Sequence, residues 1–162
     1  MSLFGIGYDC HRLAPGRRLV IGGVEIPHEL GLEGHSDADV LAHAVIDALL
    51  GAAGLGDIGE HFPDSDERYR DADSIALLRE VVALLARNAL APANVDCTVI
   101  LEAPRLGAQR AQIRAKLAEA LGLSEARVNV KATTSERMGF IGRGEGAAAI
   151  AVASLEEARS GG

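Results

Sequence analysis

Alternation of apolar and polar residues predicts strands at both ends and in the middle of the chain. Apolar residues occupy positions 95, 97, 99 and 101, with Asp96 and Thr98 between them, as in a strand with one buried face. A pair of glycines divides the segment 18–26, which we expect to form one or two short strands. We expect strands over residues 3–10, 18–26, 95–101, 128–133 and 147–155.

Three other segments repeat their apolar residues every three to four positions, which predicts three helices. The first helix follows Ser36 and Asp39, which resemble a capping box with Ser36 as the N-cap residue. We expect the helices to extend to about residue 53, over 73–88, and over 109–121 with Gly122 after the last turn.

Strands and helices alternate without a strict βαβ order. This arrangement predicts an α+β fold, in which helices cover one face of a single mixed sheet. The length of 162 residues suits one domain, which we place at residues 1–158, followed by a frayed C-terminal tail over 159–162.

Composition narrows the range of partners. Apolar residues make up 48% of the chain and charged residues 24%, as in globular proteins with a core. The formal net charge is −7 and no basic stripe is present, so we expect neither a nucleic acid nor a membrane as partner. An anionic ligand would therefore need a bound cation to attract it.

The chain shows no segment that predicts secretion or membrane insertion. The N-terminal residues lack a basic region, and the apolar stretches 40–56 and 146–155 fall short of the about 18 apolar residues that a membrane span needs. Cys10 and Cys97 lack a C-x-x-C spacing, and we interpret them as reduced core thiols of a cytoplasmic protein.

A candidate metal site begins with Asp9 and His11. Residues two apart on a strand share a face, so this carboxylate and imidazole converge while Cys10 points away. A polar pair at a strand end would have the same pattern, and Asp-x-His alone does not separate the two interpretations.

His43 strengthens the metal interpretation. It lies on the first predicted helix, with Asp39 and Asp47 one turn away on either side. The alternative is a core histidine paired with Asp47. Together with Asp9 and His11, His43 would give three protein ligands and an open fourth position, the pattern of a working metal site.

Other polar segments suit phosphate groups. His35 and Ser36 precede the first helix, where free backbone N–H groups attract anions. The sequence G-x-G-x-x-G at 54–59 follows a helix rather than a strand, so we interpret it as a polar binding loop, not as a dinucleotide site. The run 131–136, followed by the glycine-rich run 142–146, suits phosphates and a second, oxygen-ligated cation.

These motifs resemble one known family. The runs Y-D-x-H, G-H-S-D-x-D-x-x-x-H, L-G-D-I-G-x-x-F-P-D and V-N-V-K-A-T-T-x-E-x-x-G-F-x-G-R-G-E-G are similar to those of 2-C-methyl-D-erythritol 2,4-cyclodiphosphate synthases, over residues 5–155. The chain departs from the usual motif at Ser135, where a threonine is commoner, and at residues 105–107.

The resemblance implies a set of site residues. Asp9, His11 and His43 would bind one divalent transition metal per chain, which could be zinc, manganese or cobalt. His35, Thr134 and Glu136 would be catalytic, and Glu136 would hold a second ion, magnesium or manganese, with the substrate diphosphate. The implied substrate-binding residues are Asp9, His11, His35, Ser36, Asp57, Ile58, Gly59, Phe62, Pro63, Asp64, Ser65, Asp66, Leu101, Glu102, Ala103, Pro104, Arg105, Leu106, Gly107, Ala132, Thr133, Thr134, Ser135, Glu136, Phe140 and Arg143.

The resemblance also implies an activity and an assembly. The enzyme would be a phosphorus–oxygen lyase of non-mevalonate isoprenoid (terpenoid) biosynthesis, with a small diphosphocytidyl substrate. The 2-phosphate of 4-diphosphocytidyl-2-C-methyl-D-erythritol 2-phosphate would attack the β-phosphorus and expel CMP. The fold would be a two-layer sandwich that assembles as a homotrimer, with active sites between protomers.

Two other functions fit parts of the pattern. One is a metal-dependent phosphohydrolase with His and Asp ligands, although helical enzymes of that kind carry their ligands on helices, whereas Asp9 and His11 lie on a predicted strand. The other is a non-enzymatic trimeric module that binds a metal or an isoprenoid. The product formed from the diphosphocytidyl substrate would distinguish them.

Overall fold

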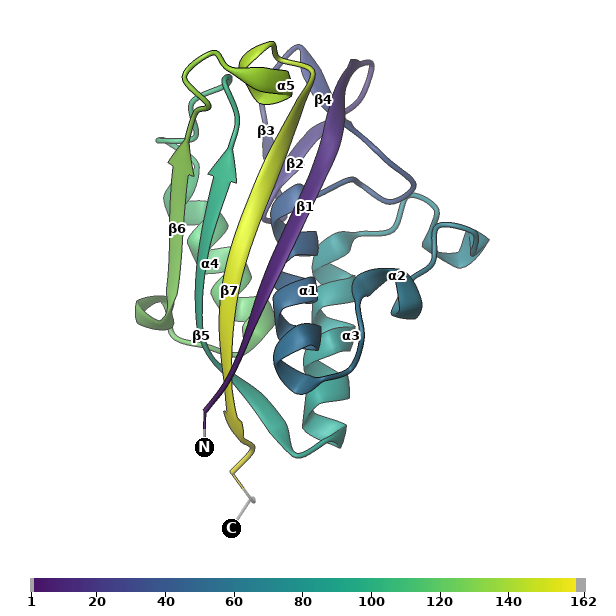
Figure 1. Cartoon of the computed structure of the whole chain (residues 1–162), viewed down its shortest axis with the longest axis vertical. Helices are drawn as coiled ribbons and strands as arrows, with labels where there is room; N and C mark the ends of the chain where they lie inside the picture. The colour runs from purple at the N-terminus through teal and green to yellow at the C-terminus, as the bar shows by residue number, and fades with distance from the viewer. Residues whose placement is uncertain (1, 160–162) are drawn as a thin grey trace.

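A five-stranded mixed sheet forms one layer of the computed structural model, which describes residues 2–159 (Figure 1). The strand order is β4-β1-β7-β5-β6, and every pair is antiparallel except β5 and β6, which are parallel. A separate two-stranded sheet pairs β2 with β3. The strands are β1 (Leu3–Pro15), β2 (Leu19–Ile21), β3 (Val24–Ile26), β4 (Leu30–Glu33), β5 (Leu90–Ile100), β6 (Val128–Thr133) and β7 (Gly146–Glu157).

Three long helices form the second layer on one face of the large sheet (Figure 1). They are α1 (Val40–Ala53), α3 (Ser74–Arg87) and α4 (Arg110–Leu121). The shorter elements are α2 (Ile58–His61), α5 (Gly139–Gly142) and two 3-10 turns, η1 (Glu67–Tyr69) and η2 (Glu125–Arg127). The predicted α+β fold, with one mixed sheet covered by helices on one face, is confirmed.

Small residues let α1 lie unusually close to the sheet. Gly5 and Gly7 of β1 face this helix, and a Cβ atom added at Gly7 would lie 1.9 Å from the carbonyl oxygen of Ala44. The residues of β7 directly opposite Gly5 and Gly7 are Ala153 and Ala151, both fully buried. Because the next residues on this face of β1 are Asp9 and His11, the same close approach brings α1 next to their side chains.

The N-cap of α1 differs from the prediction. Asp39, not Ser36, caps the helix, and its Oδ1 accepts hydrogen bonds from the N–H groups of Ala42 and Gly22. Its Oδ2 accepts from the N–H of Gly23, so this carboxylate also holds the β2–β3 turn. Complete burial raises the pKa of Asp39 to about 6, although these N–H donors act in the opposite direction.

Two strands are longer than predicted, because their hydrogen-bonded pairing continues beyond the segment in which apolar and polar residues alternate. β1 continues past residue 10 to Pro15, where it pairs with β4, a short strand that the sequence pattern did not indicate. β5 begins at Leu90 rather than at residue 95, and α2 and α5 form single turns where no helix was predicted.

The two cysteines are free, but only one is a core thiol. Cys97 is buried, which raises its pKa to about 12. Cys10 is exposed, because it alternates with Asp9 and His11 and therefore points to the helix-free face of the sheet. The interpretation of Cys10 as a core residue is wrong.

No helix within residues 2–159 is long and apolar enough to span a membrane. Residues 160–162 of the predicted C-terminal tail lie outside the described residues.

Candidate functional site

Three side-chain donor atoms converge between β1 and α1. The Oδ2 of Asp9 lies 2.8 Å from the Nε2 of His11 and 3.1 Å from the Nδ1 of His43. The two histidine nitrogens are 3.2 Å apart. Ligand bonds of about 2.0–2.1 Å in a tetrahedral zinc site separate the donor atoms by about 3.3 Å, so these three atoms match one face of such a tetrahedron. The residues fit the predicted metal triad.

The surroundings of His11 fix its orientation. Its Nδ1 donates a hydrogen bond to the carbonyl oxygen of Glu33 on β4, at 3.1 Å. A neutral ring with its proton on Nδ1 has its lone pair on Nε2, the atom that faces Asp9 and His43. β4, which the sequence pattern did not indicate, therefore orients His11 through a hydrogen bond to the ring nitrogen that does not face the metal position.

The side-chain carboxylates on either side of His43 do not bind its ring. Asp47 accepts a hydrogen bond from the N–H of Ile58, and Asp39 accepts backbone N–H groups at the helix start. The alternative of a core histidine paired with Asp47 is therefore wrong. Neither acid orients the second ring nitrogen of His43, because the hydroxyl groups of Ser36 and Ser74 lie there.

Charge favours a cation at this position. Burial raises the pKa of Asp9, but the neighbouring imidazole rings of His11 and His43 outweigh it and leave the pKa below its ordinary value. Burial lowers the pKa of His11, but the hydrogen bond and charge of Asp9 outweigh it and raise the pKa. The carboxylate thus attracts a positive charge, which a proton on His11 or a metal ion supplies.

A cavity of about 420 Å³ opens beside the triad. Its lining includes most residues predicted for this half of the site, namely Asp9, His11, His35, Ser36, His43, Ile58, Gly59, Phe62, Pro63 and Asp64. Gly34, Tyr69 and Leu77 also line it and were not predicted. Tyr69 meets Phe62 edge to face with ring centroids 5.2 Å apart, and its position among the few aromatic residues of the chain is the only sequence signal that could have identified it.

Three of the substrate-binding residues implied by the resemblance for this half of the site, Asp57, Ser65 and Asp66, do not line this cavity. The Asp57 side chain caps α2, and the Asp66 side chain binds Arg68. The backbone carbonyl of Asp66 nevertheless accepts a hydrogen bond from the Nε2 of His35, at 3.0 Å. Ser65 lies between Asp64 and Asp66 in the chain and does not line the cavity either.

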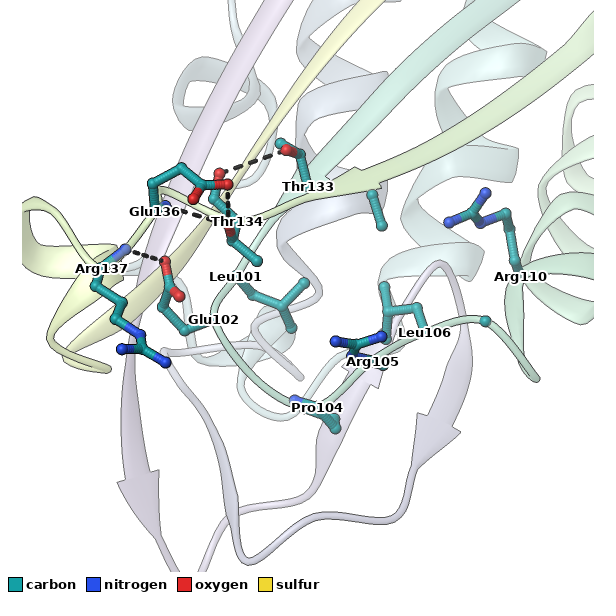
Figure 2. A pocket seen from close by; sticks show the side chains of 12 residues that line it. Leu101, Glu102, Pro104, Arg105, Leu106, Arg110, Thr133, Thr134, Glu136 and Arg137 are labelled. Atoms are coloured by element: carbon teal, nitrogen blue, oxygen red, sulfur yellow. Dashed lines mark hydrogen bonds between the residues drawn. The ribbon is translucent and has the colours of Figure 1, made fainter.

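A second cavity, of about 620 Å³, lies where the parallel strands β5 and β6 end (Figure 2). Its lining residues are Leu101, Glu102, Pro104, Arg105, Leu106, Gly107, Arg110, Ala132, Thr133, Thr134, Glu136 and Arg137. Among the predicted residues of this half, Ala103 and Ser135 do not line it. Arg110 and Arg137 also line it and were not predicted, because Arg110 lies outside the motifs that carry the resemblance and Arg137 occupies an unspecified position within one of them.

Glu102 joins the two loops of this cavity. Its Oε1 accepts a hydrogen bond from the N–H group of Ser135. The same oxygen accepts a second hydrogen bond, from the N–H group of Arg137 (Figure 2). Within the second loop, the N–H of Glu136 donates to the Oγ1 of Thr134, at 3.1 Å. Glu136 and Arg137 both have a positive φ, which turns the chain sharply and leaves the Glu136 carboxylate exposed to solvent.

Phe140 and Arg143 reach neither cavity. Arg143 forms an ion pair with Glu145 at 2.8 Å, and Phe140 lines a smaller hollow of about 220 Å³ beside Cys10 and Arg12. The two larger cavities share no lining residue. Most of the predicted site residues therefore fall into two groups, which we name after their predicted ligands: a metal half, between β1 and α1, and a nucleotide half, at the ends of β5 and β6.

Sequence comparisons agree with the resemblance. A model of the YgbB family matches residues 3–156. The chain is 56% identical over 151 residues to the 2-C-methyl-D-erythritol 2,4-cyclodiphosphate synthase of Alkaliphilus metalliredigens, covering 93% of this chain and 95% of that protein. It is 58% identical over 153 residues to the enzyme of the same name from Symbiobacterium thermophilum, covering 94% and 98%.

Solved structures share the fold. The bifunctional IspDF of Campylobacter jejuni superposes with a TM-score of 0.93 and 41% identity, covering 97% of this chain and 42% of that longer chain. A CDP-bound 2C-methyl-D-erythritol-2,4-cyclodiphosphate synthase gives a TM-score of 0.87 and 37% identity, covering 94% and 99%. The chain therefore belongs to the YgbB family, and its resemblance to the 2-C-methyl-D-erythritol 2,4-cyclodiphosphate synthases is confirmed.

Proposed function

We propose that the chain converts 4-diphosphocytidyl-2-C-methyl-D-erythritol 2-phosphate into 2-C-methyl-D-erythritol 2,4-cyclodiphosphate and CMP. A 2-phosphate oxygen bonds to the β-phosphorus, and the bond from that phosphorus to the bridging oxygen of CMP breaks. The observation that carries the proposal is a metal triad beside one cavity combined with a nucleotide-sized cavity, in a fold whose relatives bear this enzyme's name.

The reaction needs positioning and charge neutralisation rather than a protein nucleophile, because both reacting groups belong to one substrate. A divalent ion at Asp9, His11 and His43, which we propose to be zinc, manganese or cobalt, would supply positive charge for the phosphates. A second ion, magnesium or manganese, would bind between Glu136 and the diphosphate.

The chain's own groups complete the proposed site. The carbonyl of Asp66 holds the His35 ring at the wall of the metal cavity, beside Ser36, where both side chains can contact the erythritol phosphate. In the nucleotide half, Thr134 and the guanidinium groups of Arg105 and Arg110 can bind the ribose and phosphates of the cytidine diphosphate.

We further propose that the active enzyme is a homotrimer whose sites lie between protomers. The helix-free face of β1 supports self-association, since Phe4 and Ile6 on it are each 69% exposed. Tyr8 continues this apolar face, and its partner residue across the β1–β7 pair is the exposed Ile150. The separation of the metal and nucleotide halves within one chain further supports a site completed by a neighbour.

The test is incubation with the diphosphocytidyl substrate and a divalent metal, followed by mass spectrometry of the products. We expect the cyclic diphosphate and CMP in equal amounts. Release of inorganic phosphate without a cyclic product would indicate a phosphohydrolase instead, and no turnover with any divalent metal would indicate a binding module.

A further inference from the structure

We propose that Ser74 and Asp37 are positioning residues that hold His43 in the one neutral form able to bind a metal through Nδ1. The inference rests on the metal triad of the proposed function. It concerns two residues that lie in neither of the two large cavities and were not predicted as part of the site.

The two nitrogens of the His43 ring face different surroundings. Nδ1 points to Asp9 and His11, at 3.1 and 3.2 Å. Nε2 points to the start of α3, where it lies 2.8 Å from the Oγ of Ser74. Ser74 is fully buried, and His43 is 9% exposed, so water does not readily replace this contact.

Counting donors and acceptors fixes the direction of that hydrogen bond. The carboxylate of Asp37 accepts three hydrogen bonds, from the Oγ–H and the N–H of Ser74 and from the N–H of Asp39. A serine hydroxyl has a single proton, and that of Ser74 is engaged by Asp37. The Oγ of Ser74 can therefore only accept from His43, which requires a proton on Nε2.

This proton determines what Nδ1 can do. A neutral imidazole with its proton on Nε2 has its lone pair on Nδ1, directed at the metal position. The other neutral form would direct an N–H group there, and an N–H group cannot be a ligand. The hydrogen-bonded series Asp37–Ser74–His43 thus selects the ligand form of the ring, as outer hydrogen-bond partners do in other metal sites.

Ser36 does not make the same selection. Its Oγ is 3.2 Å from the Nε2 of His43 and accepts a hydrogen bond from the N–H of Ala38. No protein acceptor engages its proton among the described residues, so this hydroxyl can either donate to Nε2 or accept from it. Without Ser74, the ring would be free to adopt either neutral form.

Zinc affinity, measured by competition with a chromophoric chelator, tests the inference in three variants. Ser74→Ala should weaken zinc binding by about 10- to 100-fold, the usual effect of losing an outer hydrogen-bond partner, and Ser74→Thr, which keeps the hydroxyl, should restore most of it. Ser36→Ala is the matched control and should change zinc affinity much less. Melting temperatures of the metal-free proteins show that each variant folds.

Asp37→Asn tests the same hydrogen-bonded series by changing the group that accepts the proton of Ser74. An amide cannot accept from all three donors, and if its NH₂ group faces Ser74, the serine proton is released toward the Nε2 of His43. We expect weaker zinc binding here too. We also expect faster solvent exchange of the His43 Nε2–H resonance in the zinc-loaded Ser74→Ala protein, an effect that general destabilisation would not confine to this proton.

The outcomes separate the inference from the proposed function. Wild-type protein that binds zinc, together with a folded Ser74→Ala protein that binds it equally well, would contradict the inference alone. A wild-type protein that binds no zinc would contradict the metal assignment and this inference together.

Discussion

The metal half and the nucleotide half of the proposed site are built in opposite ways. Around His43, polar side chains hydrogen-bond to one another in a buried network that includes Ser74. In the nucleotide half, the side chains of Arg105, Arg110 and Glu136 are exposed to solvent. A small ion demands fixed donor positions, whereas a nucleotide brings many polar atoms of its own and tolerates mobile partners. Changes in the metal half should therefore disturb geometry, and changes in the nucleotide half should remove single contacts.

The largest expected effect comes from breaking the close packing beneath the metal half. In Gly7→Ala, the added methyl group would lie 1.9 Å from the Ala44 carbonyl, so α1 must move away from β1. We expect the free energy of unfolding to fall by about 1–3 kcal/mol or more, with loss of zinc binding as His43 moves away from Asp9. Urea unfolding and metal analysis measure both effects.

Gly51→Ala is the control for that substitution. Gly51 lies on α1, and its added methyl group would meet nothing closer than 4.0 Å. Because alanine favours helices, we expect unchanged or slightly higher stability. Equal stability losses at Gly7 and Gly51 would show that close approach to β1 is not the cause.

The second prediction separates the two halves chemically. Thr134→Val and Glu136→Gln should lower kcat by about 10²–10³-fold if these groups act on the charge that develops at phosphorus. Both should retain a full equivalent of transition metal, because neither residue approaches the triad. Loss of zinc from either folded variant would contradict the division into halves.

The third prediction concerns pH and the metal half alone. The raised pKa of His11 means that its proton stabilises the metal-free fold below the ordinary histidine pKa and that this contribution is lost as pH rises through the folded-state value. Zinc must displace that proton, so zinc affinity should fall about tenfold per pH unit below the folded-state pKa and level off above it. An affinity that does not vary with pH would contradict this coupling.

The smallest effect is expected at the edge of the nucleotide half. Arg110 is exposed at the start of α4, and an exposed ion pair with a phosphate contributes little. We expect Arg110→Ala to raise KM about two- to fivefold with kcat unchanged. A lower kcat at unchanged KM would give Arg110 a role in the reaction itself.

Local patterns in the sequence predicted the three metal ligands but not the residues that orient them. Asp9 and His11 followed from strand alternation, and helical periodicity placed His43 on a neighbouring element. Ser74 and Asp37 are 37 positions apart, and only the packing of α3 against α1 joins them, so no local pattern indicates their contact. The start of α1 was misassigned because both Ser36 and Asp39 carry a capping oxygen, and tertiary contacts with the β2–β3 turn decide between them.

The most direct test of a site shared between protomers is complementation between two inactive variants. His43→Ala lacks one of the three metal ligands, and Thr134→Val has a damaged nucleotide half. The two variants are mixed in equal amounts, unfolded and refolded together. If trimers form at random, roughly a quarter of the sites should be restored, because such a site needs its metal half from a Thr134→Val chain and its nucleotide half from a His43→Ala chain. No recovery at any mixing ratio, with both variants folded and assembled, would mean that each site is built within one chain and would contradict the account.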